Sequence, residues 1–144
     1  MLKEGINLAI GTDGPASNNC LDMFREMFLV TALAKYREND ASAVDALEVL
    51  KMATIGGAKA MNLTDCDVLA EGKEADIIMI DLNQPNMQPI HNIQKNLVYS
   101  GSKQNVKLTM VAGKILYENG EFFIGTDAYK IYEKANDIAE RIVK

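Results

Sequence analysis

The spacing of apolar residues in the first third of the chain predicts one strand and two helices. Residues 6–10 are apolar apart from Asn7 and are followed by glycine and proline, which is typical of a short buried strand. Residues 21–36 carry apolar side chains around much more than one stripe, so this helix is expected to pack on two sides. Asn19 is the predicted N-cap of this helix, and Ser42 is the predicted N-cap of the next one.

The second of these helices is expected to continue towards Met61 in spite of two glycines, Gly56 and Gly57, in its interior. A glycine inside a helix costs about 1 kcal/mol relative to alanine, because it loses more backbone freedom on folding. The sequence therefore predicts that this part of the helix packs closely against a neighbouring segment, which would offset the cost.

After Leu63 the period of the apolar pattern changes from that of a helix to that of a strand. Residues 75–82 form an apolar run flanked by acidic residues, which predicts a central strand. The Asn119-Gly120 pair is a specific signal for a hairpin turn. Three further runs are expected to form an antiparallel meander: residues 106–111, 114–118 and 121–124.

The two remaining segments are predicted to be a loop and a helix. Residues 84–102 contain two prolines and are interpreted as a structured crossing loop with a short extended piece at 97–99. From about Asp127 the chain is predicted to be helical, because pairs of opposite charge four residues apart support a helix there. The same helix carries one apolar stripe, which consists of Ile131, Ala135, Ile138 and Ile142.

Composition and length narrow the function classes. The chain has 144 residues, of which 48% are apolar and 24% charged, as in an ordinary globular domain with one core. Its net charge of −5, with acidic residues spread along the chain, argues against binding to nucleic acid. Neither an export signal nor an apolar run of the roughly 18 residues that a membrane span needs is found. We therefore expect a cytoplasmic protein with no membrane partner.

The cysteines and the single histidine do not form a recognisable metal or redox motif. Cys20 and Cys66 make no CxxC pair and are expected to be reduced thiols. Cys20 is close to Asp13 in sequence, but a small apolar residue near a helix start explains it better than a metal ligand does. His91 is interpreted as a structural histidine. A hydrolytic zinc site takes three protein ligands, so this chain is not expected to build one alone.

Asp13 is the candidate for chemistry. It follows the predicted strand at 6–10, and catalytic groups in α/β barrels lie at such strand ends. The alternative from the residues alone is that Asp13 forms a turn with Gly14 and accepts hydrogen bonds from nearby backbone amides. A (β/α)8 barrel takes about 250 residues, so if Asp13 ends a barrel strand, the other strands lie outside this chain.

Residues 11–23 carry a more specific signal, because they resemble the GTDG-x-ASNN-x-LDM stretch of one enzyme family. In the amidohydrolase superfamily, the 5-methylthioadenosine/S-adenosylhomocysteine deaminases typically have this stretch at the end of the last barrel strand. The resemblance continues through residues 52–58, 72–82, 88–92 and 97–100. The chain thus resembles the C-terminal third of such a deaminase.

This resemblance implies a role for one residue. In that family the aspartate at the end of the eighth strand binds the catalytic zinc, contacts the substrate and takes up the proton of the attacking water. Asp13 is the matching position, so the resemblance implies that it is the catalytic, substrate-binding and metal-binding residue of this chain. One Zn²⁺ per complete site is implied. Its remaining ligands are histidines on earlier strands, which lie outside this chain.

The resemblance also implies an α+β fragment with three parts. Residues 1–62 correspond to the last strand and following helices of a (β/α)8 metal-dependent hydrolase barrel, and residues 63–126 to part of a composite β-sandwich. Residues 127–144 form a C-terminal helix that is expected to pack on the sandwich. Such a fragment exposes unpaired strand edges and an uncovered helix face, so we expect a homo-oligomer, with the missing upstream barrel as a second partner.

The function implied by the resemblance is that of the C-terminal portion of a zinc-dependent hydrolytic deaminase. The whole enzyme would replace the 6-amino group of an adenosine derivative with an oxo group, and this portion is expected to be inactive alone. Two alternatives are a subunit of a split enzyme and a non-catalytic binding or scaffolding domain. Related amidohydrolases act on guanine, cytosine or chlorinated triazines, and the sequence does not identify the substrate, because most substrate-binding groups lie outside this chain.

Overall fold

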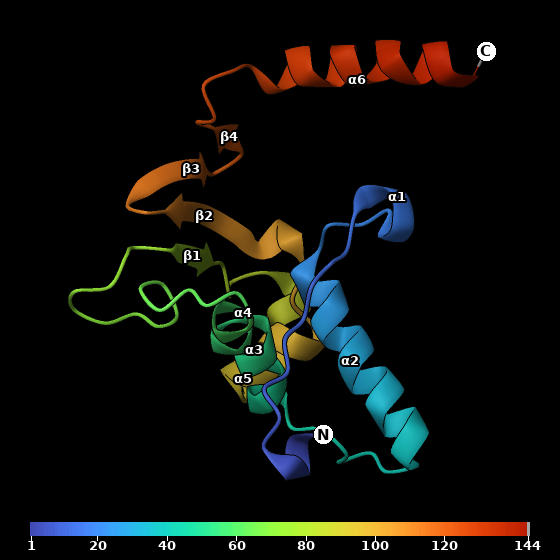
Figure 1. Cartoon of the computed structure of the whole chain (residues 1–144), viewed down its shortest axis with the longest axis vertical. Helices are drawn as coiled ribbons and strands as arrows, with labels where there is room; N and C mark the ends of the chain where they lie inside the picture. The colour runs from blue at the N-terminus through green and yellow to red at the C-terminus, as the bar shows by residue number, and fades with distance from the viewer. Residues whose placement is uncertain (144) are drawn as a thin grey trace.

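The structure is a computed structural model that describes residues 1–143, and it combines α-helices with one sheet whose first strand lies between two of the helices in the sequence (Figure 1). The first five α-helices are α1 (Pro15–Asn18), α2 (Met23–Glu38), α3 (Ala46–Ala53), α4 (Ile55–Ala60) and α5 (Ile93–Tyr99). The strands are β1 (Ile77–Ile80), β2 (Val106–Val111), β3 (Lys114–Glu118) and β4 (Glu121–Phe122), and helix α6 (Ala128–Val143) follows. An α+β architecture, as expected, is therefore confirmed.

Helix α2 begins with a different cap from the predicted one. The side chain of Asp22 accepts hydrogen bonds from the backbone amides of Phe24 and Arg25, at 3.0 and 3.4 Å, so Asp22 is the N-cap. The prediction of Asn19 is wrong, because Asn19 has a left-handed backbone (φ 58°) and ends α1 instead. A carboxylate satisfies the free amides of a first turn well, since it also lies at the positive end of the helix dipole.

The second predicted helix is two helices. Asp45, and not Ser42, is the N-cap of α3, because its carboxylate accepts a 2.8 Å hydrogen bond from the amide of Leu47. The helix then stops at Thr54, which has non-helical backbone angles and donates its hydroxyl to the carbonyl of Leu50 at 2.8 Å. A side chain bonded to the preceding turn competes with the helical ladder, and α4 restarts after it.

The segment at residues 6–10 is extended but pairs with no strand in the described part of the chain, so the predicted strand is not confirmed. It crosses α3 and α4: the amide of Ile10 donates to the carbonyl of Met52 (3.1 Å), and Asn7 Nδ2 donates to the carbonyl of Gly56 (3.0 Å). The expected close packing of the glycines is confirmed at Gly56, which leaves no room for a Cβ next to the carbonyl of Leu8.

The sheet is antiparallel with the strand order β1-β2-β3-β4. The predicted meander is confirmed as β2, β3 and β4. Asn119 and Gly120 both have positive φ, 47° and 97°, as a tight hairpin turn between twisted strands requires. The prediction that residues 75–82 form a central strand is wrong: β1 is shorter and lies at the edge, because within residues 1–143 only β2 pairs with it.

The core lies where α2, α3 and α5 meet. Its buried members are Phe24, Met27, Ala46, Val49 and Val98. Helix α5 was not predicted, since residues 84–102 were interpreted as a loop with an extended piece. Asn92 explains the difference: its side chain accepts a 3.0 Å hydrogen bond from the amide of Lys95, which caps a helix that buries Val98 completely.

A buried asparagine joins the sheet to the helices. Asn105 is 1% exposed, and its Oδ1 accepts hydrogen bonds from Asn86 Nδ2 (2.8 Å) and from the amide of Ser102 (2.9 Å). The same Asn86 nitrogen donates to the carbonyl of Ser100, and the carbonyl of Asn105 accepts from the amide of Asp81. This network fixes the end of β1 and the start of β2 next to the C-terminal end of α5.

Helix α6 begins where the sequence predicts, but it does not pack on the sheet. None of its residues is buried, and Ile142 on its apolar stripe is 77% exposed. In Figure 1 the helix lies apart from the other elements. The expected packing is thus wrong for this structure, in which the apolar stripe finds no cover among residues 1–143. Within the same residues, no helix is long and apolar enough to cross a membrane.

Candidate functional site

Asp13 lies in an exposed loop between the extended segment at residues 6–10 and α1. Its backbone is left-handed (φ 57°), a conformation that most residues with a side chain disfavour and that aspartate tolerates better than most. The Asp13 Oδ1 atom accepts a 2.8 Å hydrogen bond from the amide of Gly14. The turn-forming role considered from the sequence is therefore present, and it occupies one of the two carboxylate oxygens.

Hydrogen bonds hold the loop around Asp13 together and also connect it to α2. The carbonyl of Gly14 accepts from the amides of Ser17 and Asn18, which closes the single turn of α1. The Asn18 Nδ2 atom donates to the carbonyl of Thr12 at 2.8 Å and to Glu26 Oε1 at 2.7 Å. The residue before Asp13 is thus held by a side chain that is itself attached to α2.

Sequence reasoning did not find this contact between Asn18 and Glu26. The signal was present, since Asn18 is part of the motif at residues 11–23 and Glu26 follows eight positions later, in the first turn of the next helix. The tight return of the chain through α1 brings the two side chains together. Such a return depends on the left-handed residues at both ends of α1, Asp13 and Asn19, which the apolar pattern does not reveal.

The donor atoms that the chain offers fit one position of a zinc site. An aspartate oxygen is a common zinc ligand, and the Asp13 carboxylate is exposed, with one oxygen bonded to the amide of Gly14. In residues 1–143 no three His, Cys, Asp or Glu side chains come together as metal ligands. Neither His91, exposed in the loop before α5, nor Cys20 therefore completes such a group with Asp13.

Cys66 does not have the properties of a reactive thiol. Burial raises its pKa, and the negative charge of Asp76 raises it further, so the thiol is favoured over the thiolate. In the same loop Lys73 Nζ lies 2.8 Å from the carboxylate of Asp67. The hydrogen bond from Lys73 lowers the pKa of Asp67, and Asp67 raises that of Lys73, which is the behaviour of a structural ion pair.

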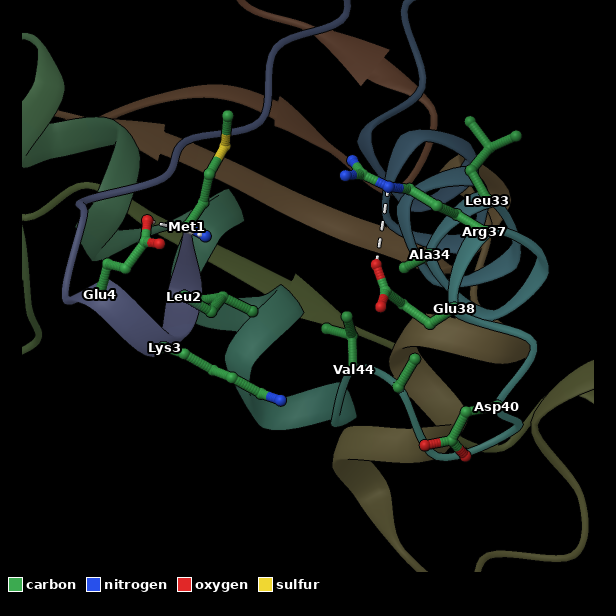
Figure 2. A pocket seen from close by; sticks show the side chains of 11 residues that line it. Met1, Leu2, Lys3, Glu4, Leu33, Ala34, Arg37, Glu38, Asp40 and Val44 are labelled. Atoms are coloured by element: carbon green, nitrogen blue, oxygen red, sulfur yellow. Dashed lines mark ion pairs between the residues drawn. The ribbon is translucent and has the colours of Figure 1, made fainter.

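A pocket of about 550 Å³ lies at the other end of α2 (Figure 2). It is lined by the N-terminal turn at residues 1–4 and by side chains that include Leu33, Arg37 and Val44. Its walls carry the ion pairs Met1–Glu4, at 3.3 Å through the terminal amine, and Arg37–Glu38, at 3.6 Å. Because the 16 residues of α2 span about 24 Å and Asp13 lies before the start of this helix, the pocket is separate from the Asp13 loop.

Comparison with known proteins gives a consistent result. The chain is 42% identical to the 5-methylthioadenosine/S-adenosylhomocysteine deaminase 1 of Archaeoglobus fulgidus over 142 residues, which is 99% of this chain and 33% of that protein. A crystal structure of an adenosine deaminase from Xanthomonas campestris with bound zinc matches 98% of this chain and 32% of its own, with 39% identity and a TM-score of 0.93.

A more distant likeness is found to an atrazine chlorohydrolase from Arthrobacter aurescens TC1, crystallised with zinc: 28% identity, a TM-score of 0.79, and coverage of 94% of this chain and 30% of that one. The chain thus spans about a third of the length of the proteins it matches. The profile of the amidohydrolase family matches residues 1–116, which is most of the sequence. The chain therefore belongs to the amidohydrolase family.

Proposed function

We propose that this chain is the C-terminal portion of a zinc-dependent hydrolytic deaminase that acts on adenosine derivatives, of the 5-methylthioadenosine/S-adenosylhomocysteine type. The observation that carries the proposal is the likeness, at 39% identity and a TM-score of 0.93, to an adenosine deaminase with bound zinc over nearly the whole chain. The Asp13 loop supports it, because that loop offers an exposed carboxylate at the end of an extended segment.

In the proposed reaction, water adds to C6 of the adenine ring and the 6-amino group leaves as ammonia. Asp13 would be one of the zinc ligands, and zinc supplies Lewis-acid activation of water when it is bound. The Asp13 carboxylate accepts a proton from the attacking water and passes it to the departing nitrogen. Because Oδ1 accepts from the Gly14 amide, we assign the proton to Oδ2.

The division of the chain is part of the proposal. Residues 1–62 belong to a barrel, residues 63–126 to a sandwich and residues 127–144 to a terminal helix, and a cytoplasmic location stays a prediction. The upstream barrel would supply the histidine ligands and most of the substrate-binding groups. Exposed apolar side chains on α2, such as Phe28 (48%) and Leu33 (64%), support contact with such a partner or with a second copy.

Hydrolysis of chlorinated triazines is the second candidate activity, and the likeness to the atrazine chlorohydrolase is the observation in its favour. That likeness is weaker than the one to the adenosine deaminase, with 28% against 39% identity and a TM-score of 0.79 against 0.93. The higher identity and TM-score of the adenosine deaminase favour an aminohydrolase. A split enzyme or a scaffolding domain differs from the first proposal in what happens when the upstream part is supplied.

A chimeric enzyme tests the proposal. In it, this chain replaces the matching third of the Archaeoglobus fulgidus deaminase. We expect the chimera to release ammonia from 5-methylthioadenosine, S-adenosylhomocysteine or adenosine, and to leave atrazine unchanged. Asp13→Asn should lower kcat by about 10² to 10⁴, the usual contribution of a general acid–base. Asp40→Asn, an exposed aspartate beyond the other end of α2, is the matched control and should leave kcat unchanged.

Two results would contradict the proposal. One is a folded, zinc-loaded chimera that deaminates none of the three nucleosides. The other is an active chimera in which Asp13→Asn has no more effect than Asp40→Asn, which would favour a scaffolding domain that keeps the Asp13 loop only as structure. Activity after mixing this chain with a separate upstream portion, without a covalent link, would favour a split enzyme.

A further inference from the structure

The side-chain amide of Asn18 uses both of its N–H donors. One bond goes to the carbonyl of Thr12 at 2.8 Å, and the other to Glu26 Oε1 at 2.7 Å. Both partners accept only, so the nitrogen of the amide must face them and the oxygen must face away. The bond to Glu26 has an ionised acceptor, and bonds of this kind are stronger and more directional than neutral ones.

The Thr12 carbonyl belongs to the peptide bond that leads directly into Asp13. Because a peptide unit is planar, holding this oxygen also fixes the direction of the Asp13 amide. Asp13 has φ 57°, and its carboxylate is further oriented by the 2.8 Å bond from the Gly14 amide. The rotation of the Thr12–Asp13 peptide therefore decides where the carboxylate lies relative to α2.

The helix itself does not need this contact. Asp22 already caps the first turn of α2 through the amides of Phe24 and Arg25. Asn18 is not required to close α1 either, since its backbone amide, and not its side chain, bonds to the Gly14 carbonyl. The two side-chain bonds thus connect three segments whose local structure is complete without them.

We propose that Asn18 and Glu26 form a clamp that positions Asp13 for its work at the metal and the substrate. This inference rests on the proposed function, because it assigns the two side chains a role towards the Asp13 carboxylate. Neither is a catalytic residue: Asn18 acts through the Thr12 peptide, and Glu26 acts by holding Asn18. Changes in residues that orient a metal ligand typically cost 10- to 100-fold in activity or metal affinity.

The first experiment is NMR spectroscopy of this chain without metal, so it does not depend on activity. The three-bond coupling between the amide and α protons of Asp13 reports its φ, and the amide shifts of residues 12–14 report the loop. Asn18→Asp removes both donors with almost no change in size, and we expect both signals to change. Asn83→Asp makes the same chemical change at an exposed asparagine that follows β1, outside the Asp13 loop, and we expect both signals to be retained.

The second experiment is kinetics of the chimeric enzyme. We expect Asn18→Asp to lower kcat and zinc affinity about 10- to 100-fold, with little change in KM. Glu26→Gln keeps an acceptor oxygen and should stay near the wild type, whereas Glu26→Ala should lose activity. The double variant Asn18→Asp/Glu26→Gln restores a bond between the two side chains but leaves the Thr12 carbonyl without its donor, so kcat should remain low.

The outcomes of these experiments test the clamp and the proposed function separately. If Asn18→Asp matches Asn83→Asp in the Asp13 coupling and in kcat, or if the double variant regains wild-type kcat, the clamp is refuted. If Asn18→Asp does not fold, the comparison of Glu26→Ala with Glu26→Gln decides, because equal kcat values would overturn the clamp. If the wild-type chimera is inactive, the proposed function fails, while the NMR comparison still tests the clamp.

Discussion

Gly56 packs directly against the backbone carbonyl of Leu8, so a Cβ atom at position 56 would overlap that oxygen. The contact attaches the extended segment that leads to Asp13 to the start of α4. Next to it, the side-chain nitrogen Nδ2 of Asn7 donates to the Gly56 carbonyl at 3.0 Å. The position of the Asp13 loop thus depends on a glycine far away in the sequence.

Substitution of the two adjacent glycines should therefore have opposite effects. Gly56→Ala is expected to lower the free energy of unfolding by about 1–3 kcal/mol, because the segment at residues 6–10 must move away. Gly57 has nothing closer to a Cβ position than the Met52 carbonyl at 4.0 Å. Gly57→Ala should thus raise the free energy of unfolding by up to about 1 kcal/mol. Urea unfolding curves measure both, and equal effects would refute the close contact.

Loss of the buried side-chain amide of Asn105 should destabilise the junction between the sheet and the helices. Asn105→Ala removes the buried oxygen that accepts from Asn86 Nδ2 and from the Ser102 amide, and we expect a loss of about 2–3 kcal/mol in the free energy of unfolding. Asn83→Ala changes an exposed asparagine in the same region and should stay within about 0.5 kcal/mol. If Asn105→Ala lowers the free energy of unfolding no more than Asn83→Ala does, the network does not stabilise the fold.

Low pH should lower the free energy of unfolding of the chain partly through Asp81. Hydrogen bonds from the Gln84 side chain and the Asn83 amide, with the charge of Lys107, lower the pKa of Asp81 in the folded state. A lowered folded-state pKa gives stability that is present above the unfolded-state pKa of about 4 and is lost as the pH falls below it. In urea unfolding from pH 7 down to pH 2, Asp81→Asn should flatten the acid side of the stability profile, while the exposed Glu140→Gln should not. A steeper loss in Asp81→Asn would reverse this assignment.

The isolated chain should associate with itself. Phe28 and Leu33 are exposed on α2, and β1 and β4 leave unpaired edges in the part of the chain that the structure describes. We expect sedimentation velocity to show dimers or larger species, and the double change Phe28→Lys/Leu33→Lys to shift them towards the monomer. Gln104→Lys adds a lysine at an exposed polar position and should have no effect. A folded wild-type monomer at high concentration would contradict this prediction.

The sequence predicted correctly those elements that are determined by residues adjacent in the chain, and failed where contacts between distant residues determine the structure. The hairpin at Asn119-Gly120 was predicted because two adjacent residues determine it. The strand at residues 6–10 is not confirmed, because a strand needs a partner and within residues 1–143 the segment bonds to α3 and α4 instead. Helix α5 was not predicted, because the two prolines favoured a loop for residues 84–102, whereas the structure places the helix after both of them, capped by Asn92.

The candidate site follows the same rule. Asp13 was identified through a motif of adjacent residues, and the turn with Gly14 through a common pair. The contact between Asn18 and Glu26 was not predicted, because it depends on how the chain turns back through α1.

The most direct test of the central claim is the zinc content of this chain and of the chimeric enzyme, measured by elemental analysis after dialysis against metal-free buffer. One carboxylate does not hold zinc tightly without further ligands, so we predict close to zero zinc in this chain and about one zinc per molecule in the chimera. Asp13→Asn in the chimera should lower that content. About one zinc bound to this chain alone, or a folded chimera without zinc, would contradict the account.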